Sequence, residues 1–249
     1  MNREATDLAG VRHIAYETLG STNAEALARA RAGERGPVWI SARRQDSGRG
    51  RRGSTWTSPP GNLYATLLLG DPSPPSVAPQ LSFVSALALH DAIAECAPQI
   101  GPLLKVKWPN DVLVGGAKIS GILIEGESEP AFAVVIGIGV NCVAHPPDAR
   151  YGATDLATAG AMVTSGQMLM ALSQAMQRRL SQWARGDGFA GIRSDWLKRA
   201  AGLGKDIKVR LPEREFSGCF EGLDDAGHLL VRGPAGLATV TAGEVFDLG

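Results

Sequence analysis

An uninterrupted apolar run, AFAVVIGIGV at residues 131–140, constrains the fold more than any other segment of this chain. A run of strand length without a polar position predicts a strand that is covered on both faces and therefore lies centrally in a sheet. The segment from Gln80 to Cys96 predicts a helix so apolar that it must also be largely buried. Together these two segments predict a core built from both strands and helices.

Strand patterns recur along the first half of the chain. Four further strands are predicted, at 11–18, 37–42, 62–70 and 103–108. Gly115-Gly116 joins two more β-prone runs and is a favoured two-residue hairpin turn. In that hairpin Val114 faces Ala117, and Lys118 folds back beside Leu113.

Helix starts are marked by capping signals. Thr22 with Glu25 three residues on forms a capping box, and so does Thr164 with Gln167. Behind the second start, apolar residues step by three or four along one helix face: Leu169, Leu172, Met176, Leu180 and Trp183. A further helix is predicted at about 188–201.

The pattern of the sequence changes near residue 202. From there to the end, short strand-like runs alternate with turns, which suggests a small β-barrel. We therefore predict two domains, residues 1–201 and 202–249.

Composition excludes several classes of protein. The chain has 25 basic and 25 acidic residues, which argues against a surface that attracts nucleic acid or anionic lipid as a whole. No apolar run approaches 18 residues without a polar interruption, so no membrane span is predicted. The polar, acidic N-terminus is unlike a secretory signal. The three cysteines are far apart and form no C-x-x-C, so we expect reduced cysteines in a cytoplasmic protein, with no metal site.

The stretch RRQDSGRGRRGSTW at 43–56 concentrates five arginines among small residues. Guanidinium groups suit phosphate and carboxylate oxygens, and glycines let backbone amides approach a ligand. The stretch predicts a flexible loop that wraps an anion, although a solvated basic loop or a nucleic-acid contact remains open. Trp56 either stacks on a purine or anchors the loop in the core.

Three further places combine polar groups with the ends of predicted elements. Asn110 and Lys118 flank the hairpin and could converge on one ligand, or form an ordinary turn and an exposed strand charge. The segment Ser21–Asn23 lies at a helix start, where free N–H groups favour polar ligands, although Thr22 could simply be a cap. Asn141 ends the central strand, a common ligand-binding position in sheets. The combination suits electrostatic catalysis on a phosphate without a protein nucleophile.

With these motifs the sequence resembles the biotin–protein ligases, also called biotin–[acetyl-CoA-carboxylase] ligases. The resemblance covers about residues 20–141. It rests on STN (21–23), Q..GRGRRG..W (45–56), SPPGNLY (58–64), KWPNDV (107–112), K..GIL.E (118–125) and GIGVN (137–141). It implies an α/β fold of α+β type: a mixed-sheet catalytic domain followed by a small C-terminal SH3-like β-barrel.

The resemblance also implies roles for residues at the matching positions. Ser21, Thr22, Asn23 and Gln45 would hold the ureido ring of biotin and its neighbouring groups. Arg49, Gly50 and Arg51 would lie in a loop that closes over biotin and its adenylate, and Gly121 would let the strand backbone approach biotin. Lys118 would meet the biotin carboxylate and the α-phosphate, so Lys118 and Arg51 are the predicted catalytic residues. Arg52, Trp56, Asn110 and Asn141 would contact the nucleotide.

The implied reaction has two steps. Biotin and ATP, with Mg²⁺ carried by the phosphates, give biotinyl-5′-AMP; a lysine of a biotin carrier domain of a biotin-dependent carboxylase then takes the biotinyl group. No tightly bound prosthetic group is expected. The attacking lysine needs a group that helps to remove its proton, and Asp111 is the nearest carboxylate within the motifs. A homodimer is possible.

The chain departs from the family pattern in two places. Ser54 and Thr55 follow GRGRRG where some relatives carry basic residues. Only 20 residues precede STN, too few for a helix-turn-helix domain, so we expect no DNA binding and no repressor function.

Three alternative functions share some of these features. A lipoate or octanoyl ligase or transferase shares the fold, but would not be expected to combine GRGRRG with KWPNDV. A nucleic-acid-binding module on Arg43–Arg52 conflicts with the neutral overall charge. A ligand-sequestering protein without turnover would not need Lys118 and the loop arginines.

Overall fold

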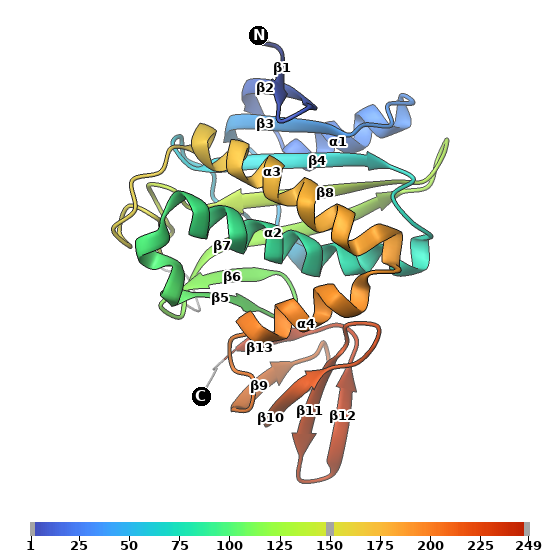
Figure 1. Ribbon diagram of the computed structural model, residues 1–249, viewed down its shortest axis with the longest axis vertical. Coiled ribbons are helices and arrows are strands. Elements are labelled where there is room, and N and C mark those ends of the chain that lie inside the picture. The colour runs from blue at the N-terminus through green and yellow to red at the C-terminus, as the bar shows by residue number, and fades with distance from the viewer. Residues whose placement is uncertain (1–2, 148–151, 247–249) are drawn as a thin grey trace.

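The computed structural model of the chain describes residues 3–147 and 152–246. Eight strands form one large sheet in the order β1-β2-β3-β4-β8-β7-β6-β5 (Figure 1). Only β2 and β3 pair in parallel among these neighbours, so the predicted mixed sheet is confirmed. The strands are β1 (Arg3–Leu8), β2 (Val11–Leu19), β3 (Val38–Gln45), β4 (Leu63–Gly70), β5 (Leu104–Lys107), β6 (Asp111–Val114), β7 (Ala117–Glu127) and β8 (Ala133–Val140).

The apolar run at 131–140 becomes β8, which lies between β4 and β7 as its composition predicts. Every residue of β8 except Gly139 is buried. The hairpin prediction is also confirmed, because Val114 pairs with Ala117 and Leu113 with Lys118. Its register places the Lys118 side chain beside the start of β6, and this matters for the site described below.

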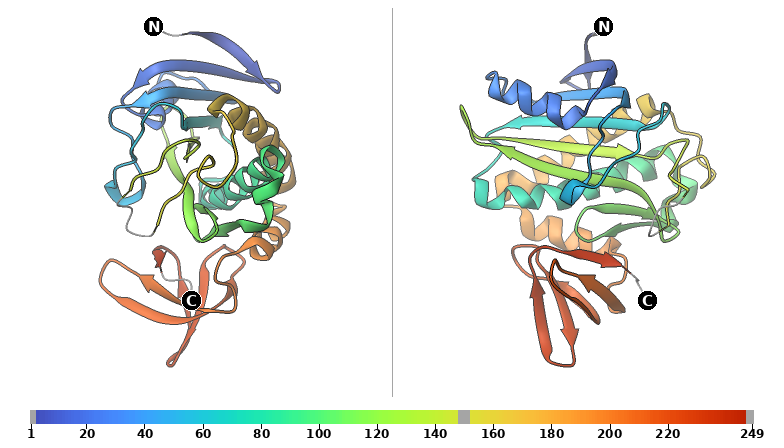
Figure 2. Two further views of the ribbon diagram at one scale, coloured as in Figure 1. Left: turned by 90° about the vertical axis from the view of Figure 1, so that its left-hand side faces the viewer. Right: turned by 180° about the vertical axis from the view of Figure 1, so that it is seen from behind.

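Helices cover the two faces of the sheet unequally. Helices α2 (Leu81–Cys96) and α3 (Ser165–Trp183) pack on one face, with α4 (Phe189–Arg199) at their end, while α1 (Thr22–Arg31) lies on the other face (Figure 2). Four short 3₁₀ segments complete the set: η1 (Arg51–Gly53), η2 (Pro75–Gln80), η3 (Pro98–Leu103) and η4 (Ala184–Gly186). The face that carries α1 is therefore open beyond that helix, and the arginine-rich loop lies over it.

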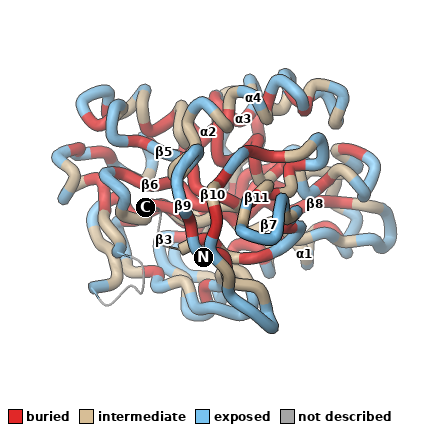
Figure 3. The backbone as a smooth tube through the Cα atoms, turned by 90° about the horizontal axis from the view of Figure 1, so that it is seen from below, coloured by how far each residue is buried: buried red, intermediate tan, exposed pale blue. Residues whose placement is uncertain are grey.

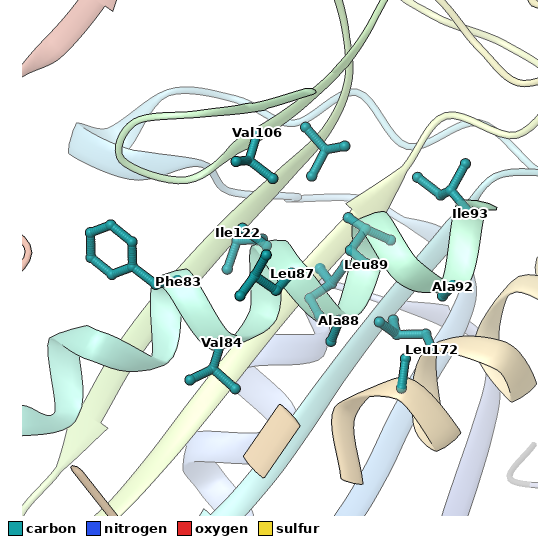
Figure 4. Packing of buried hydrophobic residues seen from close by; sticks show 14 of the residues in the cluster. Phe83, Val84, Leu87, Ala88, Leu89, Ala92, Ile93, Val106, Ile122 and Leu172 are labelled. Atoms are coloured by element: carbon teal, nitrogen blue, oxygen red, sulfur yellow. The ribbon is translucent and has the colours of Figure 1, made fainter. Parts of the chain in front are cut away.

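Helix α2 forms the centre of the main hydrophobic core, with ten buried residues (Figure 4). By length and composition alone, Pro75–Cys96 would be long and apolar enough to cross a membrane, with a mean hydropathy of 1.3. Of the most apolar 18 residues in this segment, 61% are buried inside the protein, against the sheet and α3. Packing in the core thus accounts for its apolar composition.

One capping prediction is wrong and the other is confirmed. The N-cap of α1 is Ser21, whose side chain accepts from the amide of Ala24, and Thr22 is already the first helical residue. Thr22 does not act as the cap because its hydroxyl is turned toward β3 and β4 instead. At α3 the box of Thr164 and Gln167 forms as predicted.

The C-terminal strands form a five-stranded antiparallel sheet in the order β12-β11-β10-β9-β13. They are β9 (Asp206–Arg210), β10 (Glu215–Leu223), β11 (Leu229–Gly233), β12 (Gly236–Val240) and β13 (Glu244–Phe246). The strand pairing does not establish a closed barrel.

The two sheets share one core, because a single cluster of buried apolar side chains includes residues of β9–β13 and of α2. Buried segments occur in both parts of the chain (Figure 3). Trp108 Nε1 donates to the Gly227 carbonyl across this junction at 3.2 Å. The predicted boundary near residue 202 falls between α4 and β9, and it stays a prediction.

Candidate active site

A cavity of about 660 Å³ opens on the sheet face that carries α1, between the N-terminus of that helix, the arginine-rich loop and the C-terminal sheet. All of the site residues predicted from the sequence line this one cavity. They are Ser21, Thr22, Asn23, Gln45, Arg49, Gly50, Arg51, Arg52, Trp56, Asn110, Lys118, Gly121 and Asn141. Segments up to 120 positions apart in the chain are thus brought together, although the individual roles stay predictions.

One end of the cavity is polar and is organised around Gln45. Its Oε1 accepts from the backbone amide of Thr22 at 2.8 Å, and its Nε2 donates to Ser58 Oγ at 3.0 Å. Ser58 Oγ in turn donates to the Trp56 carbonyl. The glutamine therefore links the helix start to both ends of the arginine-rich loop, and its amide is held in one orientation.

Asn23 is engaged by the protein itself. Its Nδ2 donates to the Leu123 carbonyl at 3.3 Å and to Glu125 Oε2 at 2.8 Å, while its Oδ1 accepts from Thr66 at 2.7 Å. A Cβ at Gly137 would lie 2.1 Å from that Oδ1, so only glycine leaves room for the amide. Asn23 thus fastens α1 to β7 and β4 at the edge of the cavity.

The arginine-rich loop is folded rather than extended. Its ends are joined by a bond from the Trp56 amide to the Gly48 carbonyl at 2.9 Å, and the Gly50 amide donates to the Ser54 carbonyl. Ser54 Oγ also donates to the Arg51 carbonyl at 2.9 Å. Ser54, the first residue after GRGRRG, therefore stabilises the turn that presents the arginines.

Two loop arginines contact fixed groups around the cavity. Arg49 Nη2 pairs with Glu125 at 3.2 Å, near the polar end. Arg51 donates from Nη1 to Asn110 Oδ1 at 3.2 Å and from Nη2 to the Gly243 carbonyl at 3.4 Å. Burial, and then the positive charge of Arg52, lower the pKa of Arg51. An anion placed beside Arg51 would relieve both effects, so this guanidinium is suited to a phosphate.

The indole of Trp56 lies against the sheet inside the cavity. A Cβ at Gly139 would come within 2.5 Å of the ring, and one at Gly121 within 3.1 Å, so the two paired glycines form the surface beneath it. The ammonium nitrogen of Lys118 is 5.6 Å from the ring centre. Within the described residues Trp56 Nε1 is buried without a hydrogen-bond partner, which leaves a donor available to a ligand.

Lys118 and Asp111 form the most closely spaced ion pair of the cavity. Lys118 Nζ is 2.6 Å from Asp111 Oδ1, and the buried Lys107 Nζ is 3.5 Å from Oδ2 of the same carboxylate. The short distance to Oδ1 makes Lys118 the closer of the two cations to this carboxylate. A carboxylate between two ammonium groups can release either of them to a stronger anion.

Two asparagines tie loops to the sheet. Asn110 Nδ2 donates to the Ile122 carbonyl at 2.7 Å, and Asn141 Nδ2 donates to the Thr154 carbonyl at 3.0 Å. Each amide therefore orients a segment that lines the cavity, and contact of these two positions with a nucleotide stays a prediction.

Sequence reasoning missed four groups of the cavity or its surroundings: Lys107, Thr66, Glu125 and the Gly243–Glu244 pair. Lys107 and Asp111 are four apart in KWPNDV, a spacing that could have suggested a pair. Gly243–Glu244 comes from the C-terminal sheet, and no local pattern places it beside the arginines. Across residues 3–147 and 152–246, no group of three or more His, Cys, Asp and Glu side chains is arranged to hold a metal ion.

Known proteins share both the sequence and the fold. A profile of the "Biotin/lipoate A/B protein ligase family" matches residues 14–141, and one of the "Biotin protein ligase C terminal domain" matches residues 202–246. The chain is 46% identical to biotin–[acetyl-CoA-carboxylase] ligase of Paracoccus denitrificans over 236 residues, which cover 91% of this chain and 96% of the relative.

More distant relatives also match most of this chain, in sequence or in structure. The bifunctional ligase/repressor BirA of Bacillus subtilis is 30% identical over 98% of this chain and 76% of its own length. The biotin protein ligase of Aquifex aeolicus in complex with biotin and ATP superposes with a TM-score of 0.79, at 26% identity, covering 94% of this chain and 97% of that one. With a family profile over half of its length and a near full-length relative at this identity, the chain belongs to the biotin/lipoate A/B protein ligase family.

Proposed function

We propose that this chain is a biotin–protein ligase. It activates biotin with ATP to biotinyl-5′-AMP and transfers the biotinyl group to a lysine of a biotin carrier domain, such as that of acetyl-CoA carboxylase. The observation that carries the proposal is the convergence of Lys118, Arg51 and the polar helix start on one cavity. This convergence occurs in a chain 46% identical to a biotin–[acetyl-CoA-carboxylase] ligase.

In the first step an oxygen of the biotin carboxylate attacks the α-phosphorus of ATP, and the bond to pyrophosphate breaks. Both reactants are anions, so their approach needs positive charge that is already in place. Lys118 at the hairpin and Arg51 in the loop, which both line the cavity, supply it. We propose that Mg²⁺ arrives with ATP, bound chiefly through phosphate oxygens.

In the second step the acceptor lysine attacks the carbonyl carbon of the mixed anhydride, and the bond to AMP breaks. A free lysine has a pKa near 10.4, so only about one in 10³ is neutral at pH 7. Asp111 is the carboxylate of the cavity best placed to take the proton, because it lies beside Lys118 where the anhydride would be held.

The charge and the mobility of the arginine-rich loop are needed between the two steps, while the adenylate remains bound. The anhydride reacts with water, so the enzyme must enclose it until a carrier arrives. We propose that the loop opens for substrates and closes over the adenylate, and that its arginines then bind the charge beneath it.

A lipoate or octanoyl ligase of the same fold is the second candidate. The polar end around Thr22 and Gln45 argues against it, since a dithiolane ring has no N–H or C=O groups to pair with these side chains.

We further propose two domains divided near residue 202 and a cytoplasmic location. We also propose that the chain binds no DNA, which its neutral net charge supports. Strand β1 is an edge of the large sheet, which supports pairing of two copies.

One experiment tests the proposed function directly. The purified chain is incubated with biotin, MgATP and a biotin carrier domain, and the mass of the carrier is measured. We expect an increase of one biotinyl group, none when the acceptor lysine is replaced by arginine, and none with lipoate in place of biotin. A carrier that keeps its mass in the complete mixture would refute the proposal.

A further inference from the structure

Four side chains connect the rim of the cavity with its polar end: Glu125 and Asn23, then Thr66, then Thr22. Thr66 is the central link among these four side chains. It lies on strand β4 beneath α1, and none of its surface is exposed. Its Oγ1 lies 2.7 Å from Asn23 Oδ1 and 2.8 Å from Thr22 Oγ1. A hydroxyl has a single hydrogen, so Thr66 can donate to only one of these two neighbours.

The orientation of Asn23 decides which neighbour receives that hydrogen. The Leu123 carbonyl and the Glu125 carboxylate can only accept, so the group that faces them is the Nδ2 amide. The Asn23 oxygen is therefore the atom that faces Thr66, and it also can only accept. Thr66 donates to Asn23, and toward Thr22 it offers a lone pair.

Thr22 must then direct its own hydroxyl hydrogen into the protein. Its two protein neighbours are Thr66 Oγ1 at 2.8 Å and Gln45 Oε1 at 3.2 Å. Gln45 Oε1 already accepts from the Thr22 backbone amide, which fixes it as an acceptor. Two oxygens 2.8 Å apart need a hydrogen between them, and Thr66 already gives its own to Asn23, so Thr22 donates to Thr66 and only lone pairs of the Thr22 oxygen are left for the cavity.

We propose that Thr66 is a specificity-determining positioning residue for the biotin site. It sets the hydrogen-bond polarity of Thr22, so that Thr22 accepts a ring N–H of the ureido group and rejects a ligand with an acceptor at that place. The inference rests on the proposed function, because it takes the polar end as the ureido site. The physical basis is that a buried acceptor facing an acceptor loses a hydrogen bond and leaves two desolvated oxygens.

Thr66→Val tests the proposal, because valine keeps the shape and removes the hydroxyl. We expect the KM for biotin to rise by about 3- to 10-fold, the equivalent of one hydrogen bond, with the KM for ATP unchanged. Desthiobiotin, which keeps both ureido N–H groups, should show the same rise. Thr66→Ser restores the hydroxyl and should restore the KM for biotin. Ser85→Ala, which removes another buried hydroxyl from helix α2, should leave both KM values unchanged.

A second measurement uses the unmodified chain, so the proposal stays testable if Thr66→Val does not fold. Two biotin analogues, each with one ureido N–H replaced by a ring oxygen, are compared with biotin. We expect at least one of them to bind about tenfold more weakly or worse.

Two results would overturn the proposal: a Thr66→Val variant that loses kcat with an unchanged KM for biotin, or two oxygen analogues that bind as tightly as biotin. A chain that never labels a carrier refutes the proposed function instead, so the two failures are distinguishable.

Discussion

Lys118 Nζ lies 2.6 Å from Asp111 Oδ1 across the β6–β7 hairpin, and it points into the same cavity as the loop arginines. The pair joins the residue expected to bind the phosphate in the first step to the residue expected to take a proton in the second. When the triphosphate enters, it offers Lys118 more negative charge than one carboxylate does. Lys118 can then turn to the phosphate and leave Asp111 available to the acceptor amine.

Removal of either catalytic charge should impair the first step. We expect Lys118→Ala and Arg51→Ala each to lower biotin-dependent ATP–pyrophosphate exchange by about 10²- to 10³-fold, the usual effect of removing one preorganised charge or donor. Arg43→Ala is the control, because Arg43 is exposed at the surface and pairs only loosely with Glu17. Normal exchange and normal adenylate release in both variants would contradict the assigned roles.

Asp111→Asn should separate the two steps. Asparagine keeps the size of the side chain and cannot take the proton, so transfer from preformed adenylate should slow by about 10²- to 10⁴-fold. Pyrophosphate exchange should fall less. Single-turnover transfer, measured from pH 7 to 9.5, should recover at high pH as the acceptor lysine loses its proton unaided. Equal losses in both steps, without recovery, would assign Asp111 a structural role.

Gly139→Ala should disturb Trp56, since the new Cβ would lie 2.5 Å from the indole ring. We expect the unfolding free energy to fall by about 1–3 kcal/mol, the usual cost of overpacking. Gly126→Ala on β7 is the control, because its nearest contact would be an ordinary 3.6 Å. In a Trp56→Ala background the cost of Gly139→Ala should largely vanish in urea titrations. A cost that persists there would place the clash elsewhere.

The Arg49–Glu125 pair should help to keep the loop closed. Both side chains are partly exposed, at 46% and 27%, so we expect only about 2- to 5-fold faster adenylate release in Arg49→Gln or Glu125→Gln. The double variant should release no faster than the faster single variant, because both remove one interaction. Arg44→Gln, which breaks the nearby surface pair with Asp46, should not change release. Fully additive effects would show that Arg49 and Glu125 act independently.

Asp195 makes the stability of the helical layer depend on pH. Burial alone would raise its pKa, but hydrogen bonds from Gln182, Arg179 and Lys198 outweigh that effect and lower the pKa to about 2. Its stabilising contribution is therefore complete above about pH 4 and is lost as the pH falls toward 2.

Asp195→Asn should cost about 1 kcal/mol of unfolding free energy at pH 7, after allowance for solvent screening, and less at pH 3. Urea titrations at the two pH values measure the difference. A pH-independent cost would contradict the assignment.

The sequence by itself determined the elements and their chemistry. The run that became β8 could be placed centrally because it has no polar position, and the Gly115-Gly116 turn fixed the hairpin register. Charge, glycine and amides at the ends of elements marked candidate sites, and the resemblance to the biotin–protein ligases added Gln45 and Gly121. Local pattern and side-chain chemistry are properties of neighbouring positions, so they can be read directly.

Only the tertiary structure decided which neighbours those side chains meet. Thr22 matches the capping-box pattern, with Glu25 three residues on, yet Ser21 is the cap; the difference lies in the contacts of Thr22 with Gln45 and Thr66, which are 23 and 44 positions away. The continuity of the core across the two sheets and the contact of Gly243 with Arg51 were equally hidden. Such contacts depend on the packing of strands distant in the chain. A single sequence carries no periodic signal for them, because their energy arises only when the whole sheet is assembled.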